Sequence, residues 1–302
     1  MKRRDFIKSS MAGAAVMAMP NCLNAAPAVA SELVKVDDAK NSTIKKAAKE
    51  DTFHLGMAGY TFVHFDLDKT IDFMQKLDVH YLCIKDFHLP LNSTDEQIAA
   101  FHAKLKEKGI IGYGCGPIYM KNEAEVDRAF AYAKRVGVKL LVGVPGFVTE
   151  DKKPNYDILD YVEKKVKEYD ITLAIHLHGP DMPLYPNATS IWEQVKDRDP
   201  RMGMCLDIGH NLRVGSDSMK DLKRYAKRVF DIHLKDVNAP TKAGHAMELG
   251  RGIINFPLFF KTLRQMGYSG SVSLEYEKNM KDSFNEIAES VGYFRGVQYA
   301  TR

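Results

Sequence analysis

The sequence lacks several features that would assign it to a class at once. Among its 302 residues, no internal apolar run reaches the roughly 18–20 residues that a membrane span needs, and no tract is of low complexity. The first apolar run, "LGMAGYTF", is not followed by the G-x-G-x-x-G spacing of a dinucleotide-binding turn. These absences disfavour an integral membrane protein and an open nucleotide-binding sheet.

Cysteine is also scarce. Four cysteines are present, and Cys22 falls within an N-terminal segment that resembles a signal. The other three, Cys83, Cys115 and Cys205, are an odd number and lie in apparent strands. We therefore expect small buried apolar residues rather than a disulfide framework.

The N-terminus has the three-part layout of an export signal. A basic start precedes an apolar, small-residue run and an "AVA" that ends at Ala30. "KRRDFIK" resembles a twin-arginine signal, with an ordinary secretion signal as the alternative. A lipoprotein signal through Cys22 is weaker, because "MPNC" lacks a small residue before the cysteine. We expect an export signal over 1–30, a polar tether over 31–50 and a periplasmic protein without a membrane span after signal removal.

Little net charge remains once the signal is set aside. The whole chain carries +4, of which residues 1–30 contribute +3, so the mature part carries +1. A near-neutral chain lacks the electrostatic footprint of a nucleic-acid-binding protein. We therefore expect a small-molecule partner and no nucleic acid; a homo-oligomer is possible.

Eight short apolar runs alternate with segments of helical periodicity. The runs are "FHLGMAGY", "HYLCIKDF", "GIIGYGCG", "KLLVGVPG", "ITLAIHLH", "MGMCLDIG", "VFDIHLKD" and "SVSLEYE". Strand–helix alternation implies a parallel sheet, and eight units match a closed barrel. We predict a single-domain α/β fold over residues 51–302, a (β/α)8 TIM barrel, with an open doubly wound sheet as the rival. Within it, Ser93 and Glu96 form a predicted capping box, and Gly109 ends that helix.

Ionisable residues share one face of the last four strands. Alternation places one set of side chains toward the helices and the other toward the barrel interior. The inward set is His176, His178, Asp207, His233, Lys235, Glu275 and Glu277, with His210 in the loop after the sixth strand. Buried ionised groups need partners, and barrel active sites lie at the carboxyl ends of the strands.

A divalent metal would satisfy these inward groups. Carboxylate oxygen and neutral imidazole together suit Mn²⁺, Zn²⁺ or Co²⁺. We therefore predict a metal site with one ligand per strand: His176, Asp207, His233 and Glu275.

The motifs "CLDIGH", "DIHLKDV", "LGRGIINFP" and "SVSLEYE", in this order, resemble the xylose isomerase-like barrel family of sugar isomerases and epimerases, over roughly residues 53–298. The resemblance implies metal ligation by Asp207, His233 and Glu275. It also implies substrate contact by His210, and a loop bearing Arg251 that closes over substrate. We add Lys235, Glu277 and His88 as predicted substrate-binding residues.

The chain departs from this family at two strands. Where relatives carry a glutamate on the fifth strand, this sequence has His176, which puts two-glutamate epimerisation in doubt. The second strand has Lys85 and His88 where many relatives place a glutamate. A buried lysine can act as a base or hold an oxyanion, and an ion pair with Asp86 is the alternative.

The leading functional hypothesis is metal-dependent chemistry on a non-phosphorylated carbohydrate. A base among Glu275, His178, His210 and Lys85 removes a proton next to a carbonyl. The outcome is isomerisation or epimerisation, or alternatively β-elimination by a lyase or hydratase on 3-keto-sugars or 3-keto-glycosides. A metal-dependent hydrolase of the family's endonuclease branch and a non-catalytic sugar-binding barrel are less favoured.

Overall fold

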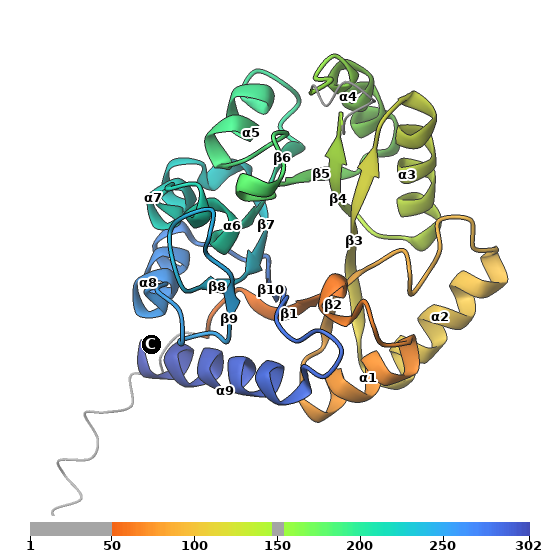
Figure 1. Cartoon of the computed structure of the whole chain (residues 1–302). Coiled ribbons are helices and arrows are strands. Elements are labelled where there is room, and N and C mark those ends of the chain that lie inside the picture. Colours follow the sequence, from red (N-terminus) through yellow and green to blue (C-terminus); the bar gives the residue numbers. More distant parts are fainter. Residues whose placement is uncertain (1–49, 147–153) are drawn as a thin grey trace, which may run out of the picture. The chain divides into compact units, whose positions relative to one another are not determined.

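The computed structural model describes residues 50–146 and 154–302 (Figure 1). The predicted export signal and almost all of the predicted tether lie outside the described residues. The described residues form one compact unit. Within it, no helix combines the length and apolar character that a bilayer crossing requires.

Eight parallel strands close into a barrel, as the alternation of apolar runs predicts. Around the barrel the order is β1, β10, β7, β6, β5, β4, β3, β2, and β1 closes the ring by pairing with both β10 and β2. The strands are β1 (His54–Ala58), β2 (Tyr81–Ile84), β3 (Ile111–Met120), β4 (Leu140–Pro145), β5 (Thr172–His176), β6 (Met202–Asp207), β7 (Val229–Leu234) and β10 (Ser271–Leu274).

Helices encircle the strands (Figure 1). Their apolar faces pack against the outward side chains of the barrel in one continuous core. The α-helices are α1 (Leu67–Lys76), α2 (Asp95–Glu107), α3 (Glu123–Val136), α4 (Ile158–Tyr169), α5 (Ala188–Val195), α6 (Ile208–Arg213), α7 (Ser218–Arg224), α8 (Phe256–Met266) and α9 (Phe284–Ala300). Short 3₁₀ turns are η2 (Gly59–Phe62), η3 (Gly179–Asp181) and η4 (Ala226–Arg228).

The start of α2 corrects one local prediction. The helix is capped by Thr94, whose side chain accepts a hydrogen bond from the backbone N–H of Gln97. The side-chain oxygen of Gln97 in turn accepts from the backbone N–H of Thr94. The predicted box of Ser93 and Glu96 is therefore wrong by one residue. Both pairs have the spacing of a capping box, so the motif alone does not choose between them. Gly109 follows the helix with a φ of 64°, as expected of a residue that ends it.

A small hairpin at the barrel mouth was not predicted. After β7, strands β8 (Asp236–Val237) and β9 (Ala246–Met247) pair antiparallel. The buried Asp236 carboxylate then accepts four backbone N–H groups: those of Val237 and Ile254 at Oδ1, and those of Gly250 and Gly252 at Oδ2. The aspartate of "HLKD" thereby fixes the "LGRG" segment beside the end of β7.

Candidate metal centre and active site

Four polar side chains meet inside the barrel at the carboxyl ends of β5, β6, β7 and β10. His176, Asp207, His233 and Glu275 are all at most 3% exposed. Parallel pairing holds them at one depth, because Asp207 is in register with His233, and Glu275 donates its backbone N–H to Leu234 O. The structure thus brings together all four residues predicted as ligands.

Their donor atoms suit a divalent ion. One ligand atom from each residue lies within 4.8 Å of the others. His176 Nε2 is 2.9 Å from His233 Nδ1, and Glu275 Oε2 is 3.7 and 3.4 Å from these two nitrogens. Nitrogen ligands about 2.1 Å from an ion and at right angles stand about 3 Å apart. Asp207 Oδ2 is buried, and its charged neighbour is the ammonium of Lys235 at 3.1 Å. The spacing and the chemistry of the four donors fit a metal site.

Protonation in the cluster points the same way. Burial lowers the pKa of His176 to about 4, so its ring is neutral. Burial also opposes a charge on His233, but the carboxylates of Glu275 and Asp231 outweigh it and raise that pKa to about 9. Burial raises the pKa of Asp207 to about 7. The carboxylates around His233 therefore favour a positive charge in the cluster, which a bound cation would also supply.

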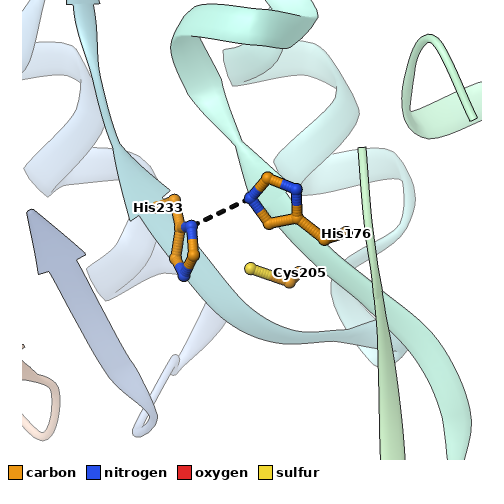
Figure 2. Close-up of side chains that lie close together, drawn as sticks. All are labelled: His176, Cys205 and His233. Atoms are coloured by element: carbon orange, nitrogen blue, oxygen red, sulfur yellow. Dashed lines mark hydrogen bonds between the residues drawn. The ribbon is translucent and has the colours of Figure 1, made fainter. Parts of the chain in front are cut away.

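A second possible set replaces the carboxylates with sulfur. Figure 2 shows Cys205 next to the hydrogen-bonded rings of His176 and His233. Cys205 lies two residues before Asp207 on β6. Metal ligation needs a thiolate, and burial holds the pKa of Cys205 well above its usual value. The carboxylate set is therefore favoured. All three cysteines of the barrel are buried and free, as expected.

Lys235 lies beside the four residues and contacts two of them. Its Nζ is 3.1 Å from Asp207 Oδ2, 3.0 Å from Glu275 Oε2 and 2.9 Å from Glu277 Oε2, and it donates to His210 Nε2 at 2.8 Å. Burial alone would lower the pKa of Lys235, but the three carboxylates raise it well above its usual value. The lysine is thus a fixed cation in the barrel.

The motif "CLDIGH" shapes this region through its backbone. Asp207 caps α6 by accepting the N–H of His210 at 2.7 Å. A Cβ on Gly209 would lie 2.3 Å from the backbone oxygen of Lys235. Glycine at this position therefore lets the first turn of α6 approach β7, which brings His210 to the lysine.

A cavity of about 150 Å³ opens above the cluster. Its lining residues are Tyr60, Lys85, Pro117, Tyr119, His176, His178, His210, Glu275 and Glu277. His178 Nε2 lies 2.9 Å from the hydroxyl of Tyr119. The Nδ1 atom of His178 is buried without a hydrogen-bond partner in the described structure, and burial holds its pKa well below the usual value. His178 is thus a neutral imidazole at the cavity wall.

Three predicted functional residues have structural partners. Lys85 lines the cavity, but its Nζ is 2.7 Å from Asp86 and 2.8 Å from Pro117 O, which is the ion pair considered as the alternative. His88 Nε2 contacts Phe65 O and Thr70 Oγ1 and is not among the cavity-lining residues. Arg251 pairs with Glu289 on α9 and does not line the cavity either.

Asp231 supports the cluster from below and was missed at the sequence level. Its Oδ2 lies 3.7 Å from His233 Nε2, and it accepts from the Tyr113 hydroxyl. A carboxylate behind a ligating histidine fixes the ring orientation and leaves the other nitrogen for a metal. The signal was available, since Asp231 precedes His233 by two residues and so shares its inward face.

Similarity to known proteins agrees with this geometry. A family model described as "Xylose isomerase-like TIM barrel" matches residues 58–296. The chain belongs to the xylose isomerase-like TIM barrel family. Within this family, L-ribulose-5-phosphate 3-epimerase UlaE of Escherichia coli O8 (strain IAI1) is 23% identical over 270 residues, covering 78% of this chain and 84% of the epimerase.

Two solved structures share the fold of this family member. The IOLI protein with a binding zinc atom is 18% identical with a TM-score of 0.62, covering 82% of this chain and 98% of its own. The probable 3-DHS dehydratase AsbF of Bacillus anthracis is 14% identical with a TM-score of 0.63, covering 80% of this chain and 99% of its own. At these identities the likeness establishes the fold.

Proposed function

We propose that this chain is a divalent-metal-dependent enzyme that removes a proton next to a carbonyl group of a non-phosphorylated carbohydrate. One observation carries the proposal: two members of a four-residue set suited to a metal, His176 and Glu275, line a cavity whose wall also presents a neutral imidazole, His178. A metal and a nearby base are the two parts that such proton abstraction requires. Similarity to an epimerase and to a zinc-bound relative supports the proposal.

His176, Asp207, His233 and Glu275 would hold the ion, and Mn²⁺, Zn²⁺ or Co²⁺ suits their mixed nitrogen and oxygen donors. When bound there, such an ion supplies polarisation of a substrate carbonyl or hydroxyl. The protein itself excludes water from the ligands, because all four are buried. The Asp231 carboxylate lies 3.7 Å behind His233 Nε2, where it would orient the ring for ligation.

His178 is the best-placed base among the four predicted groups. Glu275 contacts Lys235, which also donates to His210, and Lys85 is held by Asp86. His178 instead has a buried nitrogen, Nδ1, without a hydrogen bond in the described structure. His178 lines the cavity as a neutral imidazole, and the ring nitrogen that lacks a proton carries the lone pair that would accept the substrate proton.

A second candidate, β-elimination, is favoured by His176. Epimerisation in the two-glutamate manner uses bases on opposite faces of one carbon, and His176 stands where relatives carry the first of these glutamates. Elimination needs a single base and a donor that protonates the leaving oxygen as the C–O bond breaks. Tyr60 lines the cavity, and burial raises its pKa, so its hydroxyl stays protonated. Similarity to a dehydratase supports this alternative.

The cavity also limits the substrate. Its volume is below the roughly 300–1,000 Å³ of typical ligand pockets, so we expect it to enclose only the reacting sugar unit. Its lining includes the carboxylates Glu275 and Glu277, which would repel a phosphate. We further propose that the protein acts in the periplasm, where the resemblance of residues 1–30 to a twin-arginine signal would direct it.

The test is turnover in D₂O followed by NMR. Metal-loaded protein is incubated with free ketoses and with 3-keto-glycosides. Solvent deuterium at a carbon next to the carbonyl, with an epimer or isomer as product, supports the leading function, whereas loss of a leaving group with an enone supports elimination. His178→Gln should lower turnover at least 100-fold while keeping the metal, and the matched control His88→Gln should not. If no sugar shows either deuterium exchange or product formation, both functions are excluded.

A further inference from the structure

The ammonium group of Lys235 is enclosed by more acceptors than it has hydrogens. Four acceptor atoms, from Asp207, His210, Glu275 and Glu277, lie within 3.1 Å of Nζ. An ammonium offers three N–H donors. The side chain is 2% exposed, so water contributes little to this shell. The group therefore has the surroundings of a bound cation rather than those of a surface lysine.

Three of these acceptors form a ligand set in their own right. The donor atoms of His210, Glu275 and Glu277 lie within 4.8 Å of one another, and Glu275 also belongs to the first set. One imidazole with two carboxylates is a common metal-binding combination. Two ion positions that share a carboxylate are typical of two-metal sites, in which the ions are about 3.5–4 Å apart.

We propose that the Lys235 ammonium is a built-in second cation that fills this second set and limits the protein to one divalent ion. The inference rests on the metal site of the proposed function. The contacts support it: the ammonium lies within 3.1 Å of a carboxylate oxygen of each of Asp207, Glu275 and Glu277, the place that a second ion would need.

The backbone holds the ammonium in this place. Lys235 directly follows β7, and Gly209 allows α6 to pack against the backbone of the lysine without a Cβ between them. Unlike a metal ion, the ammonium cannot dissociate. A positive charge therefore remains beside Glu275 and Glu277, two of the residues that line the cavity, whether or not the divalent ion is bound.

The test is metal stoichiometry by native mass spectrometry during titration with Mn²⁺ or Zn²⁺. The wild-type protein should bind one ion. Lys235→Met removes the charge and keeps much of the side-chain length, so it should bind two ions. Adding Glu277→Gln to that variant should return the count to one. As a matched control, Lys85→Met removes another lysine of the same cavity, one paired with Asp86, and should leave the count at one.

Two results would overturn the inference. One is a wild-type protein that binds two ions together with a Glu277→Gln variant that binds one. This comparison does not depend on the folding of a lysine variant. The other is a folded Lys235→Met protein that still binds a single ion. Failure of the proposed function is a separate result: a wild-type protein that binds no ion removes the metal site itself, whereas correct stoichiometry without sugar turnover leaves the inference standing.

Discussion

Replacing Asp236 by asparagine should destabilise the barrel mouth strongly. Each carboxylate oxygen of Asp236 accepts two backbone N–H groups, and the side chain is buried. An asparagine presents one oxygen and one NH₂ group, so two N–H donors lose their acceptor in either orientation of the amide. A buried donor left unsatisfied costs about 1–3 kcal/mol, and because Gly250 is exposed and Gly252 and Ile254 are half-buried, we take the lower end, about 2 kcal/mol in total. For a domain of this size, we expect the Tm to fall by about 4–8 °C.

Urea unfolding followed by circular dichroism measures this loss, and limited proteolysis reports on the segment between β9 and α8. The matched control is Asp217→Asn, because Asp217 Oδ1 alone accepts the N–H groups of Met219 and Lys220. An asparagine keeps that oxygen, so the loss there should stay below about 1 kcal/mol. A loss at Asp236 no larger than at Asp217 would refute the reasoning, since the two sites would then not differ in unsatisfied donors.

Further predictions concern support, pH and surface charge. Asp231→Asn should weaken metal affinity about 10–100-fold by loosening the orientation of His233, as measured by competition with a chelating dye; unchanged affinity would contradict that role. The guanidinium of Arg201 lowers the pKa of Asp199 to about 2. The ionised Asp199 therefore contributes about 2 kcal/mol to the free energy of unfolding above its unfolded pKa near 4, and this contribution is lost as the pH falls toward 2. In Asp199→Asn, the free energy of unfolding should depend less on pH between about 4 and 2 than in the wild-type protein. Arg251→Ala should leave the Tm of thermal unfolding nearly unchanged, because its ion pair is exposed; a clear fall in Tm would argue against a surface pair.

The barrel and its inward face could be predicted because both follow from short-range periodicity. Alternation along a strand has a period of two, so "HLH" and "DIHLK" place their polar residues on one face wherever the strand begins. Closure then brings adjacent strand ends to one depth. His176, Asp207, His233 and Glu275 meet for this reason, without any knowledge of loops or rotamers.

Other features depend on contacts that periodicity does not encode. Tyr119 was missed because the third strand was predicted to end at Gly116, before a proline, whereas β3 continues to Met120 with a shift in its register against β4. The ammonium of Lys85 donates to the carboxylate of its neighbour Asp86. This contact depends on the side-chain rotamer, which the strand periodicity does not determine. Three of the four bonds to Asp236 arise where a loop returns 14 to 18 residues later, which no local pattern specifies.

The most direct test of the account is an anomalous difference map from crystals grown with Zn²⁺ or Mn²⁺. The account predicts one peak inside the barrel, about 2.0–2.2 Å from His176 Nε2, His233 Nδ1 and a carboxylate oxygen of each of Asp207 and Glu275. The absence of a peak at these atoms, or a peak bonded to Cys205 in place of the carboxylates, would contradict it.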